Sequence, residues 1–306
     1  MTSERSISGR AWLLLFALAL LWGASFLSVR VALDEVPVLT SVAHRVGWAA
    51  VVLWAVVLGT GLPVPRGWRV WIGFAGMGLL NNAIPFSLMA WGQLYIPTGL
   101  TSILNASTAI FGVLVASLLL SDERLSPRRA TGVLIGFVGV ATAIGLENLR
   151  AFDLGALAQL AVLGGTVSYA LAGVWARKML VGLAPQTAAA GMLSASTMVM
   201  VPLAWMVDGP ISLDLAPRTM IAIAYYALAA TALAYLLYYR VLALAGSGNL
   251  MLVTLLVAPI AIVLGAIVLG EALRPAAYGG FALLALGLLV IDGRALALID
   301  PRRRAR

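Results

Sequence analysis

The sequence predicts an all-α polytopic membrane protein with ten transmembrane helices, arranged as two five-helix repeats of opposite orientation, and with both termini in the cytoplasm. Three observations lead to this fold class: the composition, the recurrence of long apolar segments and an internal repeat. The 306 residues are 62% hydrophobic and 10% charged, whereas soluble domains are about 45–50% apolar and about 25% charged. A mean hydropathy of +1.02 agrees with a chain that lies largely in lipid.

Apolar segments of about 20 residues, the length that a helix needs to cross roughly 30 Å of hydrocarbon, recur along nearly the whole chain. Clusters of charge, proline and glycine separate them and mark the loops. The ten predicted spans are 11–33, 38–58, 69–91, 97–120, 129–146, 155–176, 186–207, 219–241, 249–269 and 276–293. The first span is too long for a secretion signal and no small-residue cleavage site follows it, so we expect it to be retained.

The basic residues predict the direction in which the chain crosses the membrane. With the N-terminus in the cytoplasm, the inner segments contain 15 of the 20 basic residues, as the positive-inside rule requires. The other five are Arg30, Arg45, Arg150, Arg218 and Arg274. We therefore assign the net charge of +8 to cytoplasmic loops and to contact with membrane lipid, and not to nucleic acid. The absence of cysteine excludes disulfides and thiolate metal sites.

The two halves of the chain match each other at a fixed offset of 148 residues. The matching pairs are Arg30 with Lys178, Pro37 with Pro185, Glu123 with Glu271, Leu125 with Leu273, Pro127 with Pro275, Gly132 with Gly280 and Gly139 with Gly287. The repeats are 1–150 and 151–306. Because each has an odd number of spans, the second crosses the membrane in the opposite sense. Transporters with such inverted repeats bind substrate near the membrane midplane.

Several of these segments carry a family resemblance. Both halves resemble the EamA repeat of the drug/metabolite transporter superfamily, through "LLWGASFLSVRVALDEVP", the Arg45 that ends "PVLTSVAHR", "SDERLSPRRATGVLIGFVGV" and, in the second half, "LGEALRPAAYGGFALLALGLLV". Within that superfamily the chain most resembles the YddG-type amino-acid exporters. The resemblance implies a ten-helix basket with a central cavity, located in the bacterial inner membrane, that exports amino acids. Arg45 aligns with Leu193 and so has no counterpart in the second repeat.

The stretch "GLLNNAIPFSLMAW" places Asn81 and Asn82 in the middle of an apolar span, one turn before Pro85. Because proline has no amide hydrogen, the carbonyl of Asn81 loses its helical partner and the helix can bend there. The free carbonyl and the two amides suit contact with a polar substrate. The alternative interpretation is that the asparagines hold this helix to a neighbouring helix.

Further candidates for substrate contact are hydrogen-bonding or aromatic residues within the predicted spans, namely Asn105, Tyr169, Tyr235, Trp22 and Ser25. Aromatic faces with hydroxyl or indole groups suit a zwitterion that has an apolar side chain. Close helix packing explains the small polar stripe around Asn105 equally well. Pro202 and Pro259 predict further bends, in the seventh and ninth spans.

Arg45 and His44 are the candidates for a gate or a charge within the membrane. A functional interpretation makes Arg45 a clamp for a substrate carboxylate, whereas a structural one pairs it with Asp34 or Glu35 at the end of the first span. The sequence favours the ion pair, because these acids are close in the chain. His44 is the single histidine, and a lone histidine near a helix end is more often structural than proton-carrying.

None of the 12 acidic residues lies in the middle of a span, so an intramembrane carboxylate relay is not expected. No nucleotide-binding P-loop occurs, and the "GSG" at 246–248 is expected to be a loop and not a nucleophile elbow. We expect no metal, no cofactor and no enzymatic activity, and a monomer or homodimer. These absences predict facilitated movement down the substrate gradient, and the family resemblance implies that the substrates are amino acids, aromatic and neutral ones and a broader set beyond them. The alternative is export of nucleobases, sugars or amphipathic drugs, with or without proton coupling.

Overall fold

The computed structural model describes residues 9–121, 125–144, 154–250 and 252–292, excluding the side chains at 242, 245–250, 252, 255 and 292. Every regular element in this part of the chain is a helix. The elements are α1 (Gly9–Ala32), α2 (Val38–Gly59), α3 (Trp68–Gly78), η1 (Leu79–Ala83), α4 (Ile84–Gly92), α5 (Thr98–Asn105), α6 (Thr108–Leu119), α7 (Pro127–Ile144), α9 (Leu154–Met179), α10 (Pro185–Val207), α11 (Pro217–Ala224), η2 (Tyr225–Leu233), α12 (Ala234–Leu250), α13 (Leu252–Leu269) and α14 (Pro275–Asp292). Here η1 and η2 are π-helical segments.

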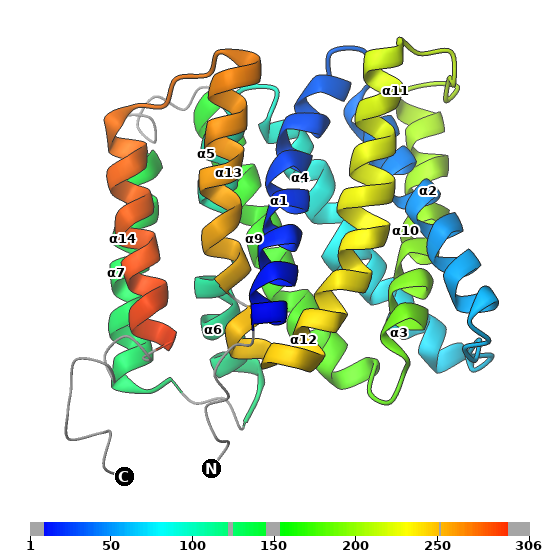
Figure 1. Cartoon of the computed structure of the whole chain (residues 1–306), viewed down its shortest axis with the longest axis horizontal. Helices are drawn as coiled ribbons and strands as arrows, with labels where there is room; N and C mark the ends of the chain where they lie inside the picture. The colour runs from blue at the N-terminus through cyan, green and yellow to red at the C-terminus, as the bar shows by residue number, and fades with distance from the viewer. Residues whose placement is uncertain (1–8, 122–124, 145–153, 251, 293–306) are drawn as a thin grey trace.

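The described helices fall in all ten predicted ranges, although their membrane-spanning character differs. Seven helical segments are long and apolar enough to cross a membrane, and the apolar helices within α13 and α14 are shorter. The start of α1 and the end of α14 lie at the same edge of the molecule (Figure 1). The count of ten membrane crossings and the cytoplasmic location of the termini stay predictions.

One loop prediction was wrong. The "GSG" segment at 246–248 lies inside α12, which continues to Leu250, whereas the predicted span ended at residue 241. Glycine lowers helix stability by about 1 kcal/mol per residue but does not forbid a helix. No proline follows to end it.

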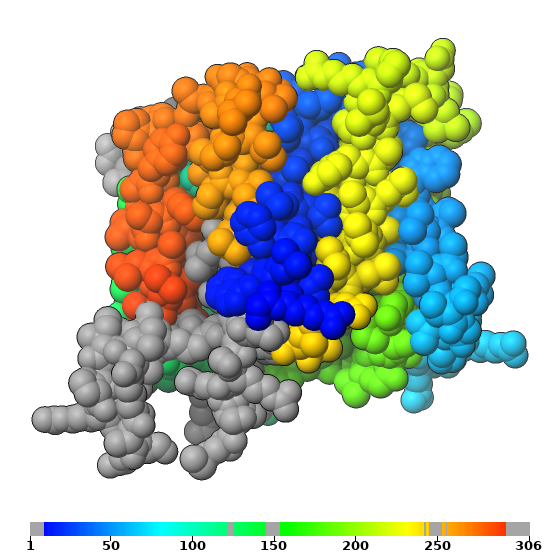
Figure 2. Space-filling model, in the orientation of Figure 1, coloured from blue at the N-terminus to red at the C-terminus, as the bar shows by residue number. Residues whose placement is uncertain are grey.

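The helix contacts follow the internal repeat. α1 packs on α13, and its counterpart α9 packs on α5 and α6. In the same way α1 packs on α11, η2 and α12, and α9 packs on their counterparts α3, η1 and α4. The space-filling view shows that α1, from the first half, lies between α13 and the segment formed by α11 and α12, from the second (Figure 2). The halves are therefore interleaved, and any site between them is built from both.

Two π-helical segments occupy equivalent places in the repeats. The offset of 148 carries Leu79–Ala83, which is η1, onto residues 227–231 inside η2. The backbone carbonyls of Gly78, just before η1, and of Leu80, inside it, accept hydrogen bonds from Ser196 Oγ (3.0 Å) and Ser168 Oγ (2.7 Å). Backbone groups in a membrane must be satisfied inside the protein, and serines of α10 and α9 do this for the widened turn.

Glycines bring α7 and α14 into backbone contact at one end of the molecule (Figure 1). A Cβ placed on Gly139 would lie 2.5 Å from the Leu284 nitrogen and 2.7 Å from the Gly280 oxygen. A Cβ on Gly132 would lie 2.7 Å from the Gly287 oxygen. The small-residue face of these helices is thus used for packing within the chain, as small residues are in many membrane helix pairs.

We expect Gly139→Ala to lower the unfolding temperature of the purified protein in detergent. The added methyl group overpacks a backbone contact, which costs roughly 1–3 kcal/mol. Gly279→Ala is the matched control, because nothing lies within 4 Å of a Cβ at that position. An equal response of the two variants would show that α7 and α14 do not pack through Gly139.

At the edge opposite to the chain ends, three carboxylates each cap the start of a helix from the other half. Asp208 Oδ2 accepts hydrogen bonds from Thr40 N (2.8 Å) and Thr40 Oγ1 (2.9 Å) at the start of α2. Glu35 accepts from Ala216 N, with its two oxygens at 3.0 and 3.2 Å, at the start of α11. Carboxylates at helix N-termini satisfy free N–H groups and interact favourably with the helix dipole.

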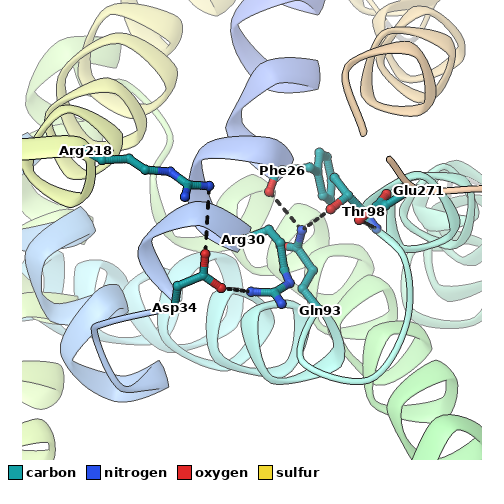
Figure 3. A network of polar contacts seen from close by, with 7 residues as sticks. All are labelled: Phe26, Arg30, Asp34, Gln93, Thr98, Arg218 and Glu271. Carbon is teal, nitrogen blue, oxygen red and sulfur yellow. Dashed lines mark hydrogen bonds and ion pairs between the residues drawn. The ribbon is translucent and has the colours of Figure 1, made fainter. Parts of the chain in front are cut away.

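The third cap belongs to a wider polar network (Figure 3). Glu271 accepts hydrogen bonds from Thr98 N (2.9 Å) and Gly99 N (3.4 Å) at the start of α5. The buried Gln93 joins this cap to α1, because its Nε2 donates to the Phe26 carbonyl at 2.8 Å. Five side chains or backbone groups from both halves therefore meet at this edge.

The Glu35 cap predicts a dependence of stability on pH. The Thr219 hydroxyl and the Ala216 N–H hold the pKa of Glu35 below its ordinary value of 4.5. The cap therefore stabilises the fold above that pH, and the stabilisation is lost as the pH falls through the lowered pKa.

We expect Glu35→Gln to lower the unfolding temperature at pH 7, and the difference from wild type to shrink as the pH approaches 3. Thermal unfolding across this range measures it. Asp214→Asn is the control, because Asp214 lies in the same loop region as the cap and its carboxylate has no hydrogen bond to another helix among the described residues. A difference that does not change with pH would contradict the assignment.

Candidate functional site

Arg45 contacts both η2 and α4, the helix that follows η1. Arg45 is in the second turn of α2 and is partly buried. Its Nε donates to Thr231 Oγ1 of η2 at 3.0 Å, and its guanidinium lies 3.9 Å from the centre of the Phe86 ring of α4. A cation over an aromatic ring in a desolvated place gains about 2 kcal/mol. One side chain thus touches both repeats.

The prediction that Arg45 pairs with Asp34 or Glu35 was wrong. Asp34 Oδ1 lies 2.6 Å from Arg30 Nη1, one turn earlier in α1, and Asp34 Oδ2 lies 3.9 Å from Arg218 (Figure 3). Glu35 caps α11 instead. Among the described residues no carboxylate lies within ion-pair distance of Arg45.

Both asparagines belong to the group of side chains around Arg45, which we call the cluster. Its other members are Phe86, Tyr169, Ser196, Tyr226, Thr231 and Tyr235. Asn81 Nδ2 donates to Tyr235 Oη at 3.0 Å, and Tyr235 Oη donates to Asn82 Oδ1 at 3.1 Å. Asn82 Nδ2 donates to Ser196 Oγ of α10 at 3.0 Å. Asn82 is fully buried, whereas Asn81 is partly exposed. Asn82 therefore holds three helical segments together, and Asn81 is the more exposed of the two asparagines.

Tyrosines complete the surroundings of Arg45. Tyr169 of α9, Tyr226 of η2 and Tyr235 of α12 are close enough to interact with its charge. Tyr226 is buried and donates to the Ser41 carbonyl at 3.2 Å. Tyr169 packs against both large apolar clusters of the core and so lies between them. The cluster offers one cation, phenol hydroxyls, amides and aromatic faces, which suits a small molecule with an acidic group and an apolar part.

The other residues singled out in the sequence lie farther from Arg45 or have other contacts. The rings of Trp22 and Tyr238 pack in a tilted arrangement with centres 5.9 Å apart, and Ser25 Oγ donates to the Trp22 carbonyl at 2.7 Å. Asn105 ends α5, where the fourth span breaks before α6. His44 is buried at a surface groove between α2 and α11.

The predicted bends have different outcomes. The helix widens into η1 just before Pro85, as the missing amide hydrogen predicts. α10 and α13 continue through Pro202 and Pro259 without interruption, so bending at these two prolines stays a prediction.

Three residues of the cluster that contact Arg45 or Asn82 were not among the predicted site residues. Thr231 binds Arg45 and also donates to the Tyr226 carbonyl at 2.7 Å, five residues earlier, inside the π-helical turn. Ser196 anchors Asn82, and Phe86 lies under the guanidinium. The offset of 148, applied to the Asn81–Pro85 bend, was the signal that could have located Thr231.

We expect Tyr235→Phe to lower the free energy of unfolding by roughly 1–2 kcal/mol, because both asparagines lose a hydrogen bond in a buried site. Tyr238→Phe is the control, since the described residues make no hydrogen bond to its hydroxyl. Equilibrium unfolding in mixed micelles measures the difference. Equal stability of the two variants would show that the hydrogen bonds of Tyr235 do not stabilise the fold.

Two related halves that meet around a polar cluster inside a membrane-spanning bundle define a multi-pass membrane transporter. The chain belongs to the EamA-like transporter family, which matches residues 9–145 and 156–292. Each half is thus one EamA unit, as the repeat predicted.

Similarity to individual proteins is more distant. The chain is 30% identical over 138 residues to Protein PagO of Salmonella typhimurium, covering 44% of each chain. It is 25% identical to an uncharacterized transporter of Archaeoglobus fulgidus, covering 79% of this chain and 83% of that one. It is 24% identical to the uncharacterized inner membrane transporter YedA of Escherichia coli, covering 61% of this chain and 60% of the other. The chain thus spans less than half the length of PagO.

A solved crystal structure shares the fold. Its TM-score is 0.66 and its sequence identity 20%, and the match covers 94% of this chain and 98% of that chain. At this identity the likeness concerns the fold alone.

Proposed function

We propose that this transporter exports amino acids, aromatic and neutral ones first, across the bacterial inner membrane by alternating access. The observation that carries the proposal is Arg45, a cation inside the bundle that contacts Phe86 and Thr231 and no described carboxylate. An arginine in this setting is a partner for a substrate carboxylate, because a planar guanidinium binds a carboxylate through two parallel hydrogen bonds.

The rest of the cluster supports the same kind of substrate. Nε of Arg45 donates to Thr231, and in our proposal the two terminal nitrogens face the ligand. Asn81 and Tyr169 provide polar groups, while Tyr169 and Phe86 provide aromatic faces for an apolar side chain. Trp22, Ser25 and Asn105 then belong to the path of the substrate, and Asn82 and Tyr235 position Asn81.

The interleaved repeats support alternating access. Arg45 bridges Phe86 behind η1 and Thr231 in η2, so a carboxylate that draws it away releases a link between the halves. We propose facilitated movement down the substrate gradient, since the described acidic side chains lie at helix ends and in loops.

The test is efflux from proteoliposomes loaded in turn with each labelled amino acid, with and without a pH gradient. We expect efflux of aromatic or neutral amino acids without a pH gradient. Efflux by Arg45→Met should be at least about tenfold slower, because losing a hydrogen bond to a charged group weakens substrate binding by about that factor.

Arg240→Met is the matched control, because Arg240 is an exposed arginine of α12 outside the cluster. If no amino acid moves, the cargo is of another class, such as nucleobases, sugars or amphipathic drugs. If efflux requires the pH gradient, the carrier is proton-coupled. If Arg45→Met exports normally, Arg45 is not the carboxylate partner.

A further inference from the structure

We infer that this carrier recognises the carboxylate of its substrate and does not require the ammonium group, so that it also transports monocarboxylates that lack an amine. The inference rests on the proposed function, because it concerns the ligand of the same Arg45 site. It concerns the charge balance of that site.

A zwitterionic amino acid brings two charges into the membrane, and each needs a partner. A buried ammonium or carboxylate without a partner is costly to desolvate. Arg45 serves the carboxylate. An ammonium would be served best by a carboxylate of the protein or by several oxygen acceptors.

The described carboxylates are all engaged or lie away from the cluster. Asp34 pairs with Arg30, Glu35 caps α11, Asp208 caps α2 and Glu271 caps α5. Asp214 lies in the loop before α11. The remaining acidic residues of the sequence lie outside the middle of the predicted spans. No described carboxylate is therefore placed to bind a substrate ammonium beside Arg45.

Some neutral hydrogen-bond acceptors of the cluster already accept hydrogen bonds from the protein. Asn82 Oδ1 accepts from Tyr235 Oη, and Thr231 Oγ1 accepts from Arg45 Nε. The Asn81 amide donates its Nδ2 to Tyr235. The site thus has a net positive charge, which favours an anion over a zwitterion and a zwitterion over a cation.

Three ligands that share one phenyl group and one chain length separate these cases. Phenylalanine carries both charges, 3-phenylpropanoate lacks the ammonium and 2-phenylethylamine lacks the carboxylate. The experiment uses the full chain in proteoliposomes at pH 7. It measures efflux of labelled phenylalanine and of labelled 3-phenylpropanoate, and the inhibition of each by the other two compounds.

We expect 3-phenylpropanoate to be transported and to compete with phenylalanine at a similar or lower concentration. We expect 2-phenylethylamine to need about 10- to 100-fold more, the factor given by a hydrogen bond to a charged group. Arg45→Met should remove the difference between the three ligands. Arg45→Lys, which keeps the charge and loses the planar fork, should weaken both carboxylates and keep their order.

The wild-type series decides the matter even if a variant fails to fold. If phenylalanine moves and 3-phenylpropanoate neither moves nor competes, the inference is overturned and amino-acid export stands. If 3-phenylpropanoate moves and no amino acid does, amino-acid export is overturned and the inference stands. If 2-phenylethylamine competes as well as 3-phenylpropanoate, or if no compound moves, the carboxylate-binding role of Arg45 is overturned.

Discussion

The structure depends on one constraint: inside hydrocarbon, a backbone carbonyl that loses its helical partner must find another partner within the protein. In the middle of the third and eighth spans the regular α-helix is replaced by the π-helical segments η1 and η2. Ser196 and Ser168 satisfy the backbone around η1 from two other helices, and Thr231 does so within η2. Ser196 also binds Asn82, and Thr231 also binds Arg45. The side chains that satisfy these backbone carbonyls therefore also hold Asn82 and Arg45 of the cluster in position.

The same logic explains how the bundle holds a cation. An arginine costs about 2.5–3.5 kcal/mol at the centre of a membrane helix and less toward its end, and Arg45 lies in the second turn of α2. The Phe86 ring and the Thr231 hydroxyl offset part of this without neutralising the charge. The result is a cation that is tolerated without being paired, which is the condition for an exchangeable partner.

Much of the fold follows from the sequence, because apolar length and the placement of charge are imposed by the bilayer itself. The internal repeat at an offset of 148 residues and the missing amide hydrogen of Pro85 are both visible in the sequence, so they could be predicted from it as well. The partners of Asn82 were not, since Tyr235 and Ser196 lie more than a hundred residues away in the chain.

The wrong partner for Arg45 came from treating proximity in sequence as proximity in space. Asp34 is four residues from Arg30 on the same helical face, which is the nearer pairing. The prediction of a loop at 246–248 was also wrong. Glycine is a weak helix former, but where no proline is present the neighbouring residues determine whether the helix continues.

The carboxylate caps have an energetic consequence for the duplicated architecture. In the proposed alternating access, two identical inverted repeats would give inward-open and outward-open states that are related by a two-fold rotation and equal in energy. Asp208 and Glu35 correspond, through the offset of 148, to Thr60 and Leu183, which have no carboxylate. These two caps therefore have no counterpart in the other repeat. In the proposed mechanism, their hydrogen bonds would make the two facing states unequal in energy and favour the state in which their own edge is closed.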